Sequence, residues 1–201
     1  MDRDSIKSIV KRFLSKPRYE HSLRVAETAQ KCAVKWKADP EQAYTAGLVH
    51  DIAKELTPEK LLNLSIPLQA VELELYDAFP LIWHAFVGPI VVKHLLPQAN
   101  EELLNTIKWH ATGKENMTLL EQILYVGDYI EPGRSFHDIP FVRECVEHNL
   151  DEAVFAVSLA SVHSLLRRGL PIHPLTLSCR EWTLKRVAKE RVKEISHYYY
   201  R

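Results

Sequence analysis

The chain places a histidine, a carboxylate and a lysine inside an apolar stretch, Ala46-Gly47-Leu48-Val49-His50-Asp51-Ile52-Ala53-Lys54-Glu55. The small and branched apolar residues suit a buried helix, but burying an imidazole or a carboxylate is unfavourable unless a partner compensates. Adjacent His50 and Asp51 are both ligand types for first-row metal ions. The stretch therefore predicts a metal site on a buried helix. The alternative is a helix end at which His50, Asp51 and Lys54 are half in water.

Helical spacing of apolar residues extends in both directions from this stretch. Asp39-Pro40 supplies an N-cap and a first helical residue for the helix that ends at His50-Asp51. Asn100 is a further N-cap, and Thr118 with Glu121 forms a capping box ahead of an apolar helix. No segment alternates with the period of a strand, and no linker or repeat interrupts the pattern. We expect an all-α fold of about ten helices.

The domain organisation follows from the same pattern. We expect one domain over residues 1–201, with a metal-binding core at about 17–135 and C-terminal helices at 138–201 packing on it. Pro89 lies within the apolar run 81–96, where it predicts a kink or a restart of the helix. Residues 176–201 are expected to form one long, charged helix.

The composition argues against several kinds of binding partner and site. Lys plus Arg and Asp plus Glu both total 26, so the formal net charge is zero and indicates no general attraction to nucleic acid or anionic membrane. No run approaches the roughly 20 apolar residues of a membrane span. The three cysteines form no CxxC pair, which argues against a disulfide framework or a thiolate zinc site. We expect a cytoplasmic protein without a nucleic-acid or membrane partner.

Further residues of metal-ligand type lie in or at the end of separate predicted helices: His21, His84, His110 and Asp128. Together with His50 and Asp51 they amount to four histidines and two aspartates, a set that suits one or two first-row cations. If two ions bind, Asp51 is able to bridge them.

Basic residues accompany these ligands along the chain: Arg18, Arg24, Lys54 and Arg134. Guanidinium groups recognise phosphate with a fork of donors, and lysine adds a compact charge. The combination of a metal with several cations indicates hydrolysis of a phosphoester or phosphoanhydride. For Arg18, His21 and Arg24, which recur every three residues, the alternative is a solvated basic face.

The order His21, His50-Asp51, Asp128 resembles the HD-domain metal-dependent phosphohydrolase superfamily, whose shared pattern is H…HD…D. The remaining motifs resemble the YqeK family of bacterial, iron-containing, symmetrically cleaving diadenosine tetraphosphate hydrolases: His50-Asp51-Ile52-Ala53-Lys54-Glu55, His84-Ala85 with Gly88, Trp109-His110-Ala111-Thr112-Gly113 and Asp128-Tyr129-Ile130-Glu131-Pro132-Gly133-Arg134. The resemblance implies a helical HD domain, iron replaceable by Mn, Co or Mg, a dinucleoside polyphosphate substrate, ADP as product and a homodimer.

The resemblance also implies roles for residues. One metal ion would be held by His21, His50, Asp51 and Asp128. His84 and His110 would either complete a second site that shares Asp51 or contact the phosphates, and one of them would protonate the leaving phosphate. The nucleotide or its phosphates would be bound by Arg18, Lys54 and Arg134, with Arg24 nearby. Asp51, Lys54, His84, His110 and Arg134 would form the catalytic set.

The nucleotide is expected to lie against Ala111 and Thr112 and to be covered by His173. Ala111 stands where many relatives have Thr or Ser, which would loosen one polar contact without removing a metal ligand. Two other functions fit the motifs: another HD nucleotidase or cyclic-nucleotide phosphodiesterase, or a non-catalytic nucleotide-binding sensor. The remaining histidines are expected to have no catalytic role: His94, His137, His148, His163 and His197.

Overall fold

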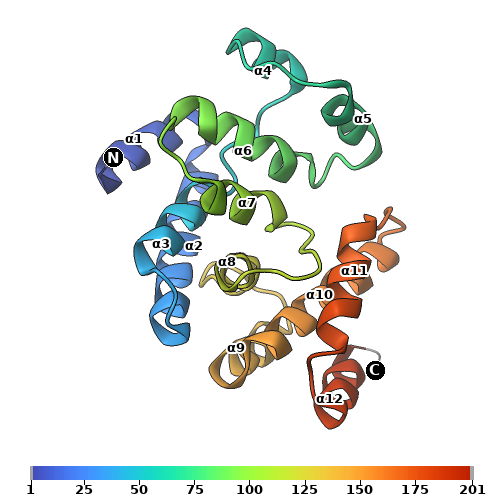
Figure 1. The fold of residues 1–201 in the computed structure, drawn as a ribbon. Coiled ribbons are helices and arrows are strands. Elements are labelled where there is room, and N and C mark those ends of the chain that lie inside the picture. Colours follow the sequence, from blue (N-terminus) through green and yellow to red (C-terminus); the bar gives the residue numbers. More distant parts are fainter. Residues whose placement is uncertain (1, 200–201) are drawn as a thin grey trace.

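The computed structural model describes residues 2–199. Within that range the chain forms twelve α-helices and no strand (Figure 1). The helices are α1 (Arg3–Phe13), α2 (Lys16–Trp36), α3 (Pro40–Val49), α4 (Pro58–Asn63), α5 (Ala70–Ala78), α6 (Trp83–Leu95), α7 (Glu101–Trp109), α8 (Leu119–Ile130), α9 (Ile139–His148), α10 (Leu150–Arg167), α11 (Pro174–Leu184) and α12 (Lys189–Tyr199). The all-α prediction is confirmed. No helix of this range is both long and apolar enough to cross a membrane.

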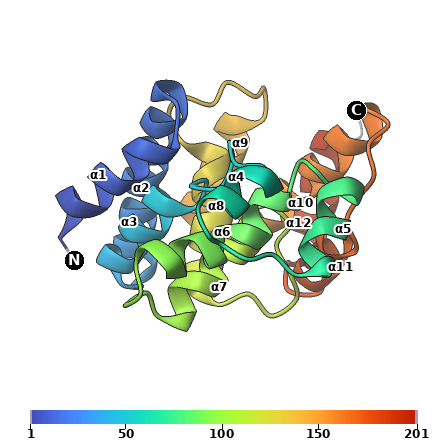
Figure 2. The same ribbon diagram turned by 90° about the horizontal axis from the view of Figure 1, so that it is seen from above.

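Helix α8 lies at the centre of the fold and packs against α2, α3, α7, α9 and α10 (Figure 1). Residues on its two sides belong to two different apolar clusters. Leu124 belongs to the cluster built mainly from α1–α3, α6 and α7, whereas Ile123 and Val126 belong to the cluster completed by α9–α12. Figure 2 shows α1–α3 and α10–α12 on opposite sides of α8. Asp128, in the last turn of α8, is thereby held by packing from both sides.

Side-chain caps fix the starts of three helices that carry or lead to predicted ligands, α3, α7 and α8. The Asp39 carboxylate accepts the N–H groups of Glu41 and Gln42, and Asn100 caps α7 through Leu103. Thr118 and Glu121 form the predicted capping box of α8. These caps confirm the predicted starts of the three helices. Helices α3 and α7 then end at His50 and His110, so both imidazoles lie at a helix C-terminus.

Helices α2 and α3 approach closely at Gly47. A Cβ atom placed on Gly47 would lie 2.6 Å from the Cα of Ala26, a separation that real Cβ contacts do not show. Only glycine fits without moving one helix backbone. This close approach brings His21 of α2 beside His50, with ring centroids 5.3 Å apart.

Two expected helix boundaries are not observed. Helix α6 continues through Pro89, so the predicted restart there is wrong, while the predicted kink stays a prediction. The preceding residue is Gly88, which lacks the Cβ that normally clashes with a following proline ring in helical conformation. The predicted helix 176–201 is instead divided into α11 and α12, and its last two residues lie outside the described range. The chain turns after Leu184, which lets Val187, Ile195 and Tyr199 all join the apolar cluster around α10.

Candidate metal centre

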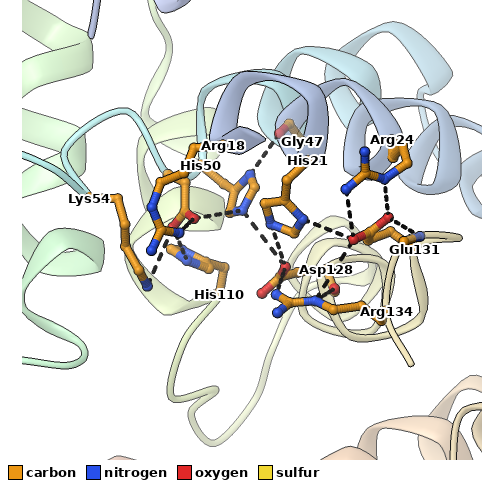
Figure 3. Close-up of polar contacts among 12 residues, drawn as sticks. Arg18, His21, Arg24, Gly47, His50, Lys54, His110, Asp128, Glu131 and Arg134 are labelled. Atoms are coloured by element: carbon orange, nitrogen blue, oxygen red, sulfur yellow. Dashed lines mark hydrogen bonds and ion pairs between the residues drawn. The ribbon is translucent and has the colours of Figure 1, made fainter. Parts of the chain in front are cut away.

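The six predicted ligand residues converge from five segments of the chain. His21 comes from α2, His50 and Asp51 follow α3, His84 lies on α6, His110 ends α7 and Asp128 lies on α8. Figure 3 shows His21, His50, His110 and Asp128 pointing toward one another. His21 Nε2 lies 3.1 Å from Asp128 Oδ1, and His84 Nε2 lies 3.1 Å from Asp51 Oδ1. The structure therefore assembles the cluster that the sequence predicts.

Two of the imidazoles are oriented by carbonyls of their own helices. His50 Nδ1 donates to the Gly47 carbonyl at 2.7 Å, and His110 Nδ1 donates to the Ile107 carbonyl at the same distance. A carbonyl only accepts, so the proton must be on Nδ1, and a neutral ring then presents Nε2 as a lone-pair donor. Complete burial lowers the pKa of His50 to about 4, so its ring is neutral at pH 7.

The His50 Nε2 atom is buried and has no hydrogen-bond partner. Buried polar atoms without a partner are rare and point to a missing ion or water. Within residues 2–199, three groups of donors have ligand atoms within 4.8 Å of one another: His21, His50 and Asp51; His50, His110 and Asp128; and Asp51, His84 and His110. Imidazole nitrogen and carboxylate oxygen suit first-row cations. The residues present therefore fit a metal, and Asp51 belongs to two of the groups.

Asp51 is ionised at the centre of the cluster. It is 4% exposed. Burial alone would raise its pKa, but the surrounding imidazoles and the Lys54 ammonium outweigh burial and hold the pKa well below the usual range. Burial lowers the pKa of His84 to about 3, which favours a neutral ring that binds a metal over a ring that donates a proton.

Three cations border the cluster. Arg134 Nη2 donates to Asp128 Oδ1 at 2.7 Å, and Arg18 Nη1 lies 3.4 Å from Asp51 Oδ2. Lys54 Nζ lies 2.9 Å from His84 Nε2, and burial lowers the pKa of this ammonium. Arg24, the fourth predicted cation, instead donates through Nε to Glu131 at 2.6 Å.

Glu131 is the residue that the sequence analysis missed. Its side chain is 1% exposed and accepts from Arg24, from the Gly133 N–H at 2.6 Å and from His21 Nδ1 at 3.1 Å. Burial alone would raise its pKa, but these donors outweigh burial and lower it. The carboxylate holds the His21 proton on Nδ1 and directs Nε2 toward Asp128. The available signal in the sequence was a carboxylate directly after Ile130 at the end of an apolar helix.

Replacing Glu131 with glutamine should weaken metal binding about 10- to 100-fold, the usual effect of losing the group that orients a metal-binding histidine. The amide leaves the Arg24 guanidinium without its counter-charge and no longer fixes the His21 ring. Metal affinity can be measured by competition with a chromogenic chelator. Glu152→Gln is the matched control, because Glu152 is also buried and pairs with Arg191 at 2.9 Å, but lies away from the cluster. Equal metal affinity in both variants would contradict this role.

Of the residues predicted to lie against the nucleotide, Ala111 and His173 line a pocket, whereas Thr112 is buried. Ala111 lines a pocket together with His173, whose ring packs at 4.8 Å from the ring of Phe79 and at 5.5 Å from that of Phe86. We call this the His173 pocket. Thr112 is fully buried and donates its hydroxyl to the Gly113 carbonyl. Its side chain is therefore closed to a ligand, which corrects the prediction that it lies against the nucleotide.

Comparison with known proteins identifies a family model and relatives that match this chain. The HD domain family model matches residues 18–133. A protein from Bacillus subtilis (strain 168) named symmetrical bis(5'-nucleosyl)-tetraphosphatase is 33% identical over 90% of this chain and 97% of its own length. A protein of the same name from Staphylococcus aureus (strain NCTC 8325 / PS 47) is 30% identical over 96% of this chain and 100% of its own length.

A solved structure is also similar. The crystal structure of a predicted HD superfamily hydrolase involved in NAD metabolism, from Clostridium acetobutylicum, matches with a TM-score of 0.82 at 32% identity, covering 93% of this chain and 99% of that one. The fold, the His and Asp cluster and the near full-length relatives agree. This chain belongs to the HD-domain family and, within it, to the YqeK-type group whose members are named symmetrical bis(5'-nucleosyl)-tetraphosphatase.

Proposed function

We propose that the protein is a metal-dependent hydrolase that cleaves diadenosine tetraphosphate, or a close dinucleoside polyphosphate, symmetrically into two molecules of ADP. The observation that carries this proposal is the buried His50 Nε2, which has no hydrogen-bond partner and lies inside a His and Asp cluster bordered by three cations. The names of the near full-length relatives supply the substrate.

We assign the primary metal site to His21, His50, Asp51 and Asp128, and a second donor set to Asp51, His84 and His110. We propose iron as the physiological metal, with Mn, Co or Mg able to substitute. A cation in this position polarises a phosphate oxygen and makes water a better nucleophile near neutral pH.

The chain's own cations would align the phosphates. Symmetrical cleavage breaks the bridge between the second and third phosphates, so the middle of the phosphate chain must lie over the cluster. Arg134, Arg18 and Lys54 would hold it there and offset the negative charge that develops in the transition state. Each already contacts a residue of the cluster, which fixes its position before the substrate arrives. Of the two candidates for protonating the leaving phosphate, His84 and His110, we favour His110 when it is not a ligand, because burial keeps the His84 ring neutral.

We place one nucleoside in the His173 pocket. Ala111, directly after His110, lines this pocket, and the His173 ring lies at its wall. His173 Nδ1 accepts the Leu175 N–H, so the ring also caps α11 and is held in place. Arg24 would support the metal site indirectly, because it pairs with Glu131, which orients His21.

The wider setting is also proposed. Residues 1–201 would act as a single HD domain, because α8 shares side chains with both apolar clusters. All three cysteines are buried free thiols, which suits the reducing cytoplasm of a bacterium. We propose a homodimer and no nucleic-acid or membrane partner.

The testing experiment is incubation of the metal-analysed protein with diadenosine tetraphosphate and ferrous ion under reducing conditions, with the products resolved by ion-exchange chromatography. ADP as the sole product is expected. ATP plus AMP would show asymmetric cleavage and contradict the proposal. Turnover only of other nucleotides in a substrate panel would indicate a different HD phosphohydrolase or phosphodiesterase, and tight ADP binding with no turnover under any metal would indicate a sensor.

A further inference from the structure

We propose that a second cavity, beside the metal centre, binds the other nucleoside of the dinucleoside polyphosphate. This inference rests on the proposed function and goes beyond it by assigning a site to each half of the substrate. The cavity has a volume of about 540 Å³ and lies among the loop after α8, the C-terminal half of α10 and the end of α12. Small-molecule pockets usually measure about 300–1,000 Å³. We call it the Phe136 chamber.

Arg134 lies between the metal centre and a lining residue of the chamber, although it does not line the chamber itself. The Arg134 guanidinium bonds Asp128 on one side, and its central carbon lies 5.7 Å from the centre of the Phe136 ring on the other. Tyr129, the residue after Asp128, lines the chamber and lies 5.4 Å from Phe136 between ring centroids. Only the Phe136 side chain would therefore separate a phosphate held by Arg134 from the chamber.

The chamber also adjoins the His173 pocket. Four residues line both cavities: Ile82, Ala111, Ser161 and Leu165. The two cavities are therefore neighbours with a common wall, and this wall includes Ala111, the residue after His110. A substrate with identical nucleosides at both ends of a phosphate chain needs two nucleoside sites that flank the point of cleavage. The chamber would enclose one nucleoside, and the His173 pocket, at about 100 Å³, would hold only part of the other.

The lining of the chamber suits a nucleoside. Phe136 is 48% exposed and presents the part of its ring not covered by Arg134 and Tyr129. Every nucleobase has a flat π-face, so any base can stack on an aromatic ring. Ser161 and Ser164 bring hydroxyls that are able to bond a ribose, and Arg167 and Arg168 add positive charge at the far end. A polyphosphate ester carries negative charge, so the arginines favour its approach.

The test compares a ligand that has one nucleoside with a substrate that has two. Adenosine 5'-tetraphosphate has the same phosphate chain but a single nucleoside, which would occupy the His173 pocket. Phe136→Ala should raise KM for diadenosine tetraphosphate about tenfold, the usual effect of losing one base stack. The inhibition constant of adenosine 5'-tetraphosphate should not change. Phe136→Trp, which restores an aromatic surface, should return KM to the wild-type value.

Leu166→Ala is the matched control, because Leu166 is an exposed apolar residue of α10 that does not line the chamber. An equal loss for both ligands in Phe136→Ala, or no loss for either, would overturn the inference. If the wild-type protein cleaves neither compound, the proposed hydrolase activity fails, and the chamber is then judged by calorimetry. Binding of diadenosine tetraphosphate should still weaken about tenfold in Phe136→Ala while that of adenosine 5'-tetraphosphate stays constant.

Discussion

Replacing Asp51 with alanine is expected to remove bound metal and to lower hydrolysis of diadenosine tetraphosphate by at least about 1,000-fold, which corresponds to about 4 kcal/mol of transition-state stabilisation. The two carboxylate oxygens face different donors. Oδ1 lies 3.1 Å from His84 Nε2, whereas Oδ2 lies 3.8 Å from His50 Nε2. Loss of this one side chain therefore removes a donor from both proposed sites. Metal content can be measured by atomic spectroscopy alongside the rate.

The control for this prediction is Asp39→Ala, which removes the N-cap of the helix that leads to Asp51. It should lower stability by about 1 kcal/mol while leaving the metal content and the rate per folded molecule unchanged. The helical circular dichroism of the Asp51→Ala protein should remain close to that of the wild type. Full activity in a metal-free Asp51→Ala protein would refute the proposed mechanism.

Gly47→Ala is expected to destabilise the fold by about 3 kcal/mol, the upper end of the usual effect of overpacking. The added Cβ would meet the backbone of Ala26 and Val25, which cannot rotate aside as a flexible side chain would. Helices α2 and α3 would have to separate, and this would also move His21 away from His50. For a domain of this size the melting temperature should fall by about 6–12 °C, which thermal unfolding followed by circular dichroism would detect.

Gly127→Ala serves as the comparison in the same experiment. Gly127 is also helical, but an added Cβ would lie 3.6 Å from Ala29, which is an ordinary contact. Alanine is favoured over glycine within helices by about 1 kcal/mol, so this variant should melt at or above the wild-type temperature. If the Gly47 variant melted with the wild type, the close approach of α2 and α3 would not be a constraint on the fold.

Features encoded locally were predictable from the sequence. Three of the helices that carry or lead to a ligand are marked in the sequence by apolar spacing and a capping residue: Asp39, Asn100 or Thr118. The all-α class and the convergence of the six ligand residues followed from that pattern together with the family resemblance.

Features that depend on distant contacts were not predictable. Glu131 orients His21 across 110 positions of sequence, so no local pattern reveals the pairing. The division between α11 and α12 has no glycine or proline to mark it, because packing of Val187 and Ile195 determines where the chain turns. Thr112 looked available in the motif, but its burial depends on how the loop after α7 folds back.

The histidines of the metal centre differ in how far away their orienting partners lie. His50 and His110 are set by carbonyls three residues earlier, so each ring is oriented as soon as its own helix end forms. His21 instead requires α2 to be seated against the end of α8, where Glu131 lies. On gentle heating the centre should come apart from the His21 side first. Release of the ion would then report loosening between α2 and α8, at a temperature below that of global unfolding.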